Sequence, residues 1–143
     1  MRFKDRWRKD LKYLLQEEFL AVRKEFFPRW DRKQEWKVKL NYNCKISGYI
    51  ANCNRESKTI FLSVGDSPPP FMSKPGNYRK LVIRCLLVHE ICHDLTPAGH
   101  GKRFQQRMSA TAKRAEELGN VEMAERLQAE IQSELPLAEQ QER

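Results

Sequence analysis

Histidine is scarce in this chain, and its distribution is uneven. The 143 residues contain three histidines, and all of them lie between His89 and His100. No C-x-x-C pair occurs, which excludes a zinc ribbon built from cysteine pairs. There is also no apolar run of membrane-spanning length and no signal-peptide pattern, since residues 1–10 are rich in charge. These absences predict a cytoplasmic protein that does not act in a membrane.

The four cysteines agree with a reducing compartment. Cys85 and Cys92 are seven residues apart in one predicted helix, about 10 Å along its axis, so they cannot form a disulfide with each other. We expect both to be buried thiols, with a metal-ligand role for Cys92 as the alternative. Cys44 and Cys53 lie near predicted strand ends and could meet across a hairpin, but a cytoplasmic location argues against a structural disulfide.

The spacing of the histidines is typical of a metal site. His89 and His93 are four residues apart, so on a helix they share one face and can bind one zinc ion together. Glu90 projects beside that face, where it can contact a metal-bound water without being a ligand. This is the H-E-x-x-H arrangement of zinc peptidases. His100 follows a turn that contains Pro and Gly, and it is the candidate third ligand, which leaves the fourth coordination position open.

The residues from Asn77 to Asp94 predict the helix that this motif requires. The segment contains no Gly or Pro, and Asn77 is a candidate N-cap because it follows Pro75-Gly76. Apolar residues occur nearly all round the helix, which predicts that it is buried. Polar site residues in a buried helix are costly unless something satisfies them, and a metal ion with a bound water would do so.

Other zinc peptidases take their third ligand from elsewhere. Metzincins place a Gly three residues after the second His and the third His three residues later, whereas Thr96 and His100 here follow His93 by three and seven residues. The thermolysin-like class uses a Glu from a second helix, at a distance that Glu116 and Glu117 approach. We therefore favour His100 and keep the two glutamates as the alternative.

The residues after the third histidine carry a family resemblance. In the stretch His100-Gly101-Lys102-Arg103-Phe104, a His is followed by Gly, two variable residues and Phe, and this pattern resembles the SprT-like metallopeptidases, the group that includes the DNA-protein crosslink protease Spartan. Weaker likeness extends upstream, so the resemblance covers about Trp36 to Met108. It implies that His89, His93 and His100 bind zinc and that Glu90 is catalytic. The C-terminal zinc ribbon of several family members is missing, so a role in DNA repair does not follow.

Charge is distributed unevenly along the chain. Residues 1–115 contain 25 Lys and Arg against 11 Asp and Glu, a balance of +14, whereas residues 116–143 contain 2 against 8, a balance of −6. A basic body favours an anionic partner, of which nucleic acid is the usual one, and DNA is the candidate here. The segment from Arg29 to Lys37 interleaves Trp30 and Trp36 with basic residues, as single-strand binders do. The opposing interpretation is that Trp36 points inward from a strand and that the basic residues are a solvated surface.

Hydrophobic periodicity predicts an α+β fold in one domain, residues 1–143, with a catalytic core at about 36–108. Its order is an N-terminal helix, a small three-stranded antiparallel sheet, the buried H-E-x-x-H helix and a C-terminal helical hairpin. The Asp66 to Gly76 segment is expected to be a loop, and Gly119-Asn120 a helix-ending turn. The expected helices are 5–26, 77–94, 102–118 and 121–135, and the expected strands are 36–42, 46–53 and 58–65.

Together these features predict a zinc-dependent endopeptidase in which a metal-activated water attacks the peptide bond and Glu90 acts as general base. The expected partner is a protein or peptide substrate, added as a strand along Thr59 to Val64, and DNA-associated proteins are candidate substrates. The alternative is a DNA-associated binding module with a non-catalytic zinc site. Three ligands plus Glu90 favour the enzyme, because a structural zinc site fills its fourth position with a protein ligand. The sequence does not fix the oligomeric state or decide between zinc and another divalent metal.

Overall fold

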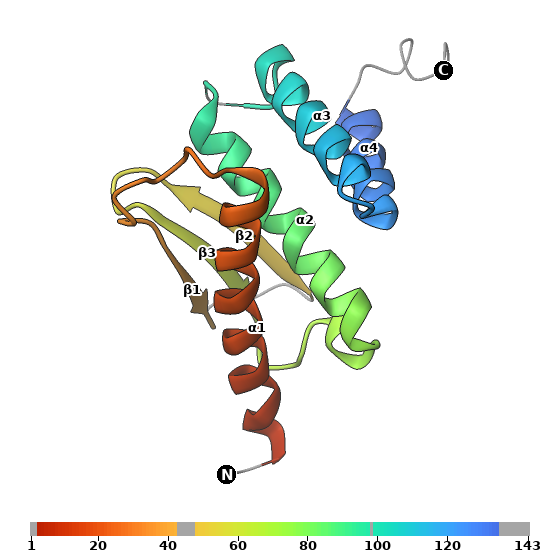
Figure 1. Cartoon of the computed structure of the whole chain (residues 1–143). Coiled ribbons are helices and arrows are strands. Elements are labelled where there is room, and N and C mark those ends of the chain that lie inside the picture. The colour runs from red at the N-terminus through yellow and green to blue at the C-terminus, as the bar shows by residue number, and fades with distance from the viewer. Residues whose placement is uncertain (1–2, 43–47, 98, 135–143) are drawn as a thin grey trace. The chain divides into compact units, whose positions relative to one another are not determined.

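The computed structural model describes residues 3–42, 48–97 and 99–134, and it shows an α+β protein (Figure 1). The chain forms two compact units, residues 1–90 and 91–143, and the boundary between them lies within helix α2. No helix among the described residues is long and apolar enough to cross a membrane. The elements are α1 (Phe3–Phe26), β1 (Lys37–Asn41), β2 (Tyr49–Asn54), β3 (Thr59–Val64), the 3-10 helix η1 (Pro70–Ser73), α2 (Gly76–Leu95), α3 (Lys102–Glu117) and α4 (Val121–Glu134).

Helix α1 has the amphipathic pattern that the sequence predicts. Leu11, Leu15, Phe19 and Val22 recur at spacings of three and four, and each is at most 4% exposed. Pro28, which cannot continue a helix, lies two residues after Phe26, the last residue of α1. The predicted N-terminal helix is therefore confirmed, and its apolar stripe forms much of the core of the first unit.

The sheet corrects the prediction of an antiparallel arrangement. Its strand order is β1-β3-β2, so β3 is the central strand and pairs in parallel with β1 and antiparallel with β2. Ile60, Leu62 and Val64 of β3 are fully buried, which explains why this most apolar strand takes the centre. The predicted substrate-binding edge along Thr59 to Val64 is also wrong, because both sides of β3 are already paired.

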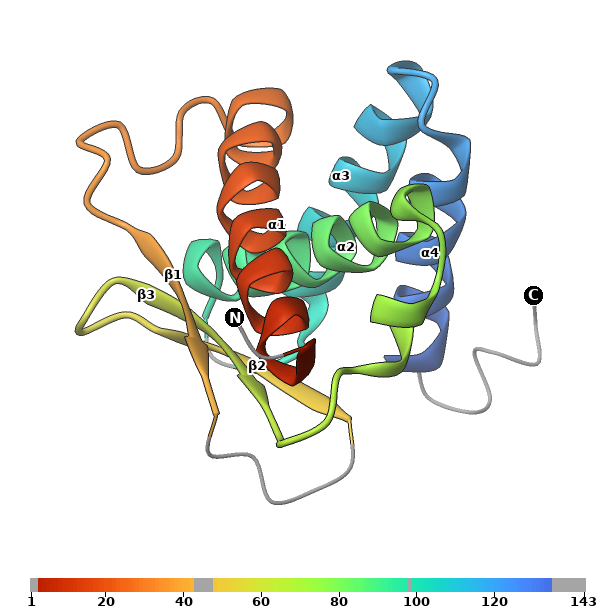
Figure 2. The same cartoon turned by 90° about the horizontal axis from the view of Figure 1, so that it is seen from below.

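One face of the sheet is covered and the other faces solvent. Figure 2 shows α1 and the part of α2 up to Glu90 on the same side of the strands. Arg84 of α2 makes ion pairs with Glu18 and Glu25 of α1 at 3.4 and 3.3 Å, which joins the two helices. The opposite face carries exposed residues such as Lys39 of β1 and Asn52 of β2. The first unit is thus a two-layer structure with one uncovered sheet face.

The predicted turn between β2 and β3 is confirmed. The backbone N–H of Ser57 donates a hydrogen bond to the Asn54 side-chain oxygen at 3.0 Å, and Lys58 has the left-handed φ of 51°. Residues 43–47, which include Cys44 and the predicted first residue of β2, lie outside the described part of the chain.

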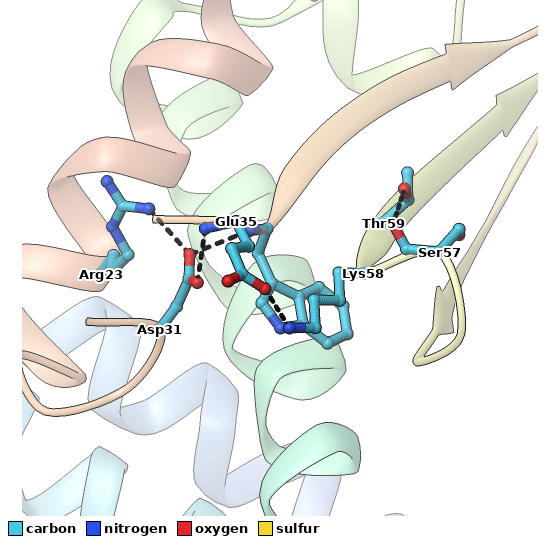
Figure 3. A network of polar contacts seen from close by, with 7 residues as sticks. Arg23, Asp31, Glu35, Ser57, Lys58 and Thr59 are labelled. Carbon is cyan, nitrogen blue, oxygen red and sulfur yellow. Dashed lines mark hydrogen bonds and ion pairs between the residues drawn. The ribbon is translucent and has the colours of Figure 1, made fainter. Parts of the chain in front are cut away.

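Asp31 organises the connection between α1 and β1 (Figure 3). Its carboxylate accepts hydrogen bonds from Arg23 Nη1 at 3.1 Å, from the Glu35 backbone N–H at 2.8 Å and from the Trp36 backbone N–H at 3.1 Å. The side chain is only 3% exposed. Beside it, Lys58 makes an ion pair with Glu35 and so joins the connection to the β2–β3 turn. One carboxylate therefore fixes how the chain leaves α1 and enters the sheet.

The two tryptophans of this connection belong to the core. Trp30 and Trp36 are 7% and 9% exposed. Their ring centroids lie 5.4 Å apart, and Trp30 also packs edge-on against Phe19 at 6.0 Å. Neither indole is available for stacking on a nucleic-acid base, so this part of the single-strand-binding interpretation is wrong. The interpretation that Trp36 points inward is confirmed.

The segment before α2 contains more structure than the predicted loop. The helix η1 buries Phe71 and Met72, and Phe71 packs edge-on against Tyr49 with ring centroids 5.0 Å apart. Helix α2 begins at Gly76, and the Pro75 carbonyl accepts the N–H groups of the third and fourth residues after it. Pro75 therefore takes the N-cap position that the sequence analysis gives to Asn77.

The second unit contains the helical pair α3 and α4, which pack against each other as predicted. Helix α3 ends in a Schellman motif. The N–H of Asn120 donates to the Ala115 carbonyl at 2.8 Å, the N–H of Gly119 donates to the Glu116 carbonyl at 3.0 Å, and Gly119 has a φ of 84°. The predicted turn at Gly119-Asn120 is confirmed, and it depends on the ability of glycine to adopt this conformation.

Candidate metal centre

Helix α2 carries the first two histidines on a single continuous element. His89 and His93 are one helical turn apart, and both are partly exposed. Ile91 and Cys92, which lie between them, are fully buried. The helix therefore holds both imidazoles at one surface while its other side is buried, as the sequence predicts.

The chain reverses after α2 and brings back the third histidine. The Thr96 hydroxyl donates a hydrogen bond to the Cys92 carbonyl at 2.7 Å, at the end of the helix. Gly99 then has a φ of 94°, a conformation that residues with a side chain rarely adopt. His100 follows directly, and its carbonyl accepts a hydrogen bond from Gln105 Nε2 at 3.4 Å.

The three imidazoles form a cluster that could hold a metal ion. One ring nitrogen from each of His89, His93 and His100 lies within 4.8 Å of the other two. The Nε2 atoms of His93 and His100 are 2.9 Å apart. Tetrahedral coordination with Zn–N bonds of 2.0–2.1 Å needs about 3.3 Å between ligand nitrogens, so a small rotation of the rings would admit the ion. This is the only such group of His, Cys, Asp and Glu among the residues that the structure describes.

Phe104 supports two of the three histidines. Its ring stacks on His93, with centroids 4.6 Å apart and planes 29° apart, and lies against His100 at 4.8 Å. Phe104 is 3% exposed and comes from the first turn of α3. Phe104 belongs to the pattern that carries the family resemblance, but this contact was not predicted. The available signal was the short spacing, because Phe104 is four residues after His100.

Glu90 combines a buried position with a titratable group. The residue is 4% exposed, and burial raises the pKa of its carboxyl, while the neighbouring His89 lowers the pKa by a smaller amount. It is not one of the three clustered ligand residues. A buried carboxyl with a raised pKa, next in sequence to a histidine of the cluster, is a candidate general acid–base.

The alternative ligands are not part of the cluster. Cys92 is fully buried as a free thiol, burial raises its pKa to about 12, and its sulfur is not among the clustered ligand atoms. Glu116 and Glu117 are exposed at the end of α3. The structure therefore brings together the residue set preferred by the sequence analysis and not the thermolysin-like one.

Comparisons with known proteins do not assign this chain to a family. No protein-family model, curated protein or solved structure matches this chain. The SprT-like resemblance therefore depends only on the residues quoted for it.

Proposed function

We propose that this protein is a zinc-dependent endopeptidase of the SprT-like kind. The observation that carries the proposal is the cluster of His89, His93 and His100, with Glu90 next to His89 on α2. Three neutral nitrogen ligands are the set that catalytic zinc sites use, with one position left for water or substrate. The basic balance of residues 1–115 makes DNA-associated proteins the candidate substrates.

Each residue of the site has a defined role in this proposal. When bound, zinc lowers the pKa of a coordinated water to about 7 and polarises a carbonyl oxygen. His89, His93 and His100 hold the ion, and Phe104 fixes the orientation of two of the rings. Glu90 accepts the proton of the attacking water and then donates it to the leaving amine.

Metal content is the first test. The purified full chain, incubated with zinc and desalted, should retain about one zinc ion per chain by elemental analysis. His93→Ala and His100→Ala should each lose most of it. The matched control is Cys92→Ala, which removes a neighbouring buried group outside the cluster and should keep the metal. If the His100→Ala variant retains as much zinc as the parent protein, His100 is not a ligand.

Proteolysis is the second test. Glu90→Gln should bind zinc as the parent does but lower cleavage of denatured casein by at least 100-fold, because the general base is lost. Glu117→Gln changes an exposed carboxylate of α3 and should leave the rate unchanged. If Glu90→Gln cleaves as fast as the parent, the role of Glu90 is wrong.

The same assay separates the enzyme from a DNA-associated binding module. Cleavage is measured with and without single-stranded DNA, and DNA binding is measured in the same buffers at two salt concentrations. Salt-dependent DNA binding without cleavage under any condition would refute the peptidase proposal and favour the DNA-associated binding module. Cleavage that begins only with DNA would make DNA an activator.

A further inference from the structure

A second candidate site lies in the first unit, near the start of α2 rather than at its histidines. A pocket of about 370 Å³ is lined by residues of α1, η1 and α2. This volume falls in the range of small-molecule sites, at its lower end. Nothing in the proposed peptidase function uses this pocket.

The pocket has an apolar side. Leu14 and Met72 contribute aliphatic surface. Met72 is only 7% exposed, so its side chain is packed into the wall of the pocket. Tyr13 also lines the pocket, and its side chain is 67% exposed. An exposed aromatic ring next to aliphatic side chains can pack against a ring or a short hydrocarbon chain.

The charged residues of the pocket are mainly positive. Lys9, Arg79 and Lys80 line it, against the single carboxylate of Asp10. Arg79 Nε donates a hydrogen bond to the Lys74 carbonyl at 2.8 Å, which holds the guanidinium group in place and leaves the Nη groups as further donors. This balance favours an anionic ligand over a neutral or cationic one.

The backbone at the pocket adds to this preference. Gly76 lines the pocket and is the first residue of α2, a helix of 20 residues. The N-terminus of a helix carries a partial positive charge and N–H groups that have no partner within the helix. A Cβ added at Gly76 would meet no atom within 4 Å, so the space beside this backbone is open.

We propose that this pocket binds a small organic anion, namely a phosphate or carboxylate group joined to an apolar body of about one ring. The anion contacts Lys9, Arg79 and Lys80 at the start of α2, and the apolar body packs against Tyr13, Leu14 and Met72. Both features are needed together, because cations on a surface bind inorganic ions only weakly.

The test is an NMR titration of the 15N-labelled full chain with four probes. Phenyl phosphate and benzoate carry both features, inorganic phosphate carries only the charge, and phenol carries only the ring. Phenyl phosphate or benzoate should shift amide signals of residues 9–14 and 76–80 and bind at least tenfold tighter than inorganic phosphate and phenol. Equal weak binding of all four probes, or shifts spread over the surface, would overturn the proposal.

Two variants locate the ligand. Gly76→Glu adds a carboxylate at a position where a Cβ meets no atom within 4 Å and should abolish probe binding, while Gly76→Ala should keep it. Lys80→Glu should weaken binding at least tenfold. Lys12→Glu is the matched control, since it makes the same charge change at an exposed residue of α1 that does not line the pocket. Equal losses in Lys80→Glu and Lys12→Glu would show non-specific attraction and refute the site.

Zinc content and casein cleavage are measured on the same variants. They should be unchanged in Gly76→Glu and Lys80→Glu. The proposal for the pocket and the proposal for the peptidase can therefore be refuted independently of each other.

Discussion

The imidazole of His93 lies stacked on the ring of Phe104, with 4.6 Å between ring centroids. His100 contacts the same ring at 4.8 Å, so one aromatic side chain supports two candidate ligands from different elements. Groups behind a metal site set the orientation of its ligands and tune its affinity. Phe104 should therefore determine how well this cluster is prearranged for an ion.

Replacing Phe104 by alanine should weaken zinc binding by roughly 10-fold to 100-fold, the range found for partners that orient ligands. The measurement is competition with a chromophoric chelator. Phe61→Ala is the control, because it makes the same substitution at a partly exposed residue of β3 that is not part of the histidine cluster. An unchanged affinity in Phe104→Ala would show that the rings need no support.

Zinc should stabilise the folded chain through the three histidines. A ligand present at 100 times its Kd adds about 2.7 kcal/mol if it binds only the folded state. Thermal unfolding should therefore shift upwards with zinc in the parent but not in His100→Ala. Magnesium, which prefers oxygen ligands, should have no effect on either protein. An equal shift with both metals would contradict an imidazole site.

Asp31→Ala should destabilise the protein by about 2–4 kcal/mol, because the partly buried Arg23 guanidinium and two backbone N–H groups lose their acceptor. Asp31→Asn should cost less, since asparagine retains one side-chain oxygen and tolerates the left-handed φ of 53°. Urea unfolding of the full chain measures both. Equal losses in the two variants would mean that the charge, and not the set of acceptors, dominates.

Trp30 and Trp36 should be insensitive to nucleic acid. In a Trp7→Phe variant these two buried residues are the remaining indoles, so the emission should be blue-shifted and weakly quenched by acrylamide. Adding single-stranded oligonucleotide should leave it unchanged even where DNA binds elsewhere on the basic body. Strong quenching by the oligonucleotide would restore the stacking interpretation for this segment.

The thiols should differ in reactivity. Cys53 is partly exposed, whereas Cys85 and Cys92 are buried. Since the thiolate is the reactive form and burial raises the Cys92 pKa to about 12, iodoacetamide at pH 8 should modify Cys53 and spare Cys92 in the native chain. Raising the pH to 10 should not change this, because Cys92 remains protonated below about pH 12. Peptide mapping by mass spectrometry reads out each site, and rapid native labelling of Cys92 would disprove its burial.

The local features of this chain could be predicted from sequence because they depend on residues close together. The repeat of Leu11, Leu15 and Phe19 defines α1, and the spacing of His89 and His93 places both imidazoles on one face of α2. Glycine at position 119 similarly marks the end of α3. His100 was predictable for the same reason, since only the turn after α2 separates it from His93.

The features that depend on distant residues were not predictable in this way. Alternation in β1, β2 and β3 indicates strands but not their order, so a sequence-order antiparallel sheet was expected instead of β1-β3-β2. The carboxylate of Asp31 and the burial of Trp30 likewise depend on tertiary contacts. A segment rich in basic and aromatic residues can belong to a solvated surface or to a core, and composition alone does not distinguish the two.

The position of β3 between its neighbours restricts how this protein can assemble during synthesis. Strand β1 leaves the ribosome first, but among the strands that the structure describes it pairs only with β3, in a register that places Val38 beside Ile60. The β2–β3 hairpin needs only a short turn, whereas the parallel pair must close a loop of about twenty residues. We therefore expect β1, the first strand to be made, to pair last. Until then its unpaired backbone N–H and C=O groups can form hydrogen bonds with an incorrect strand.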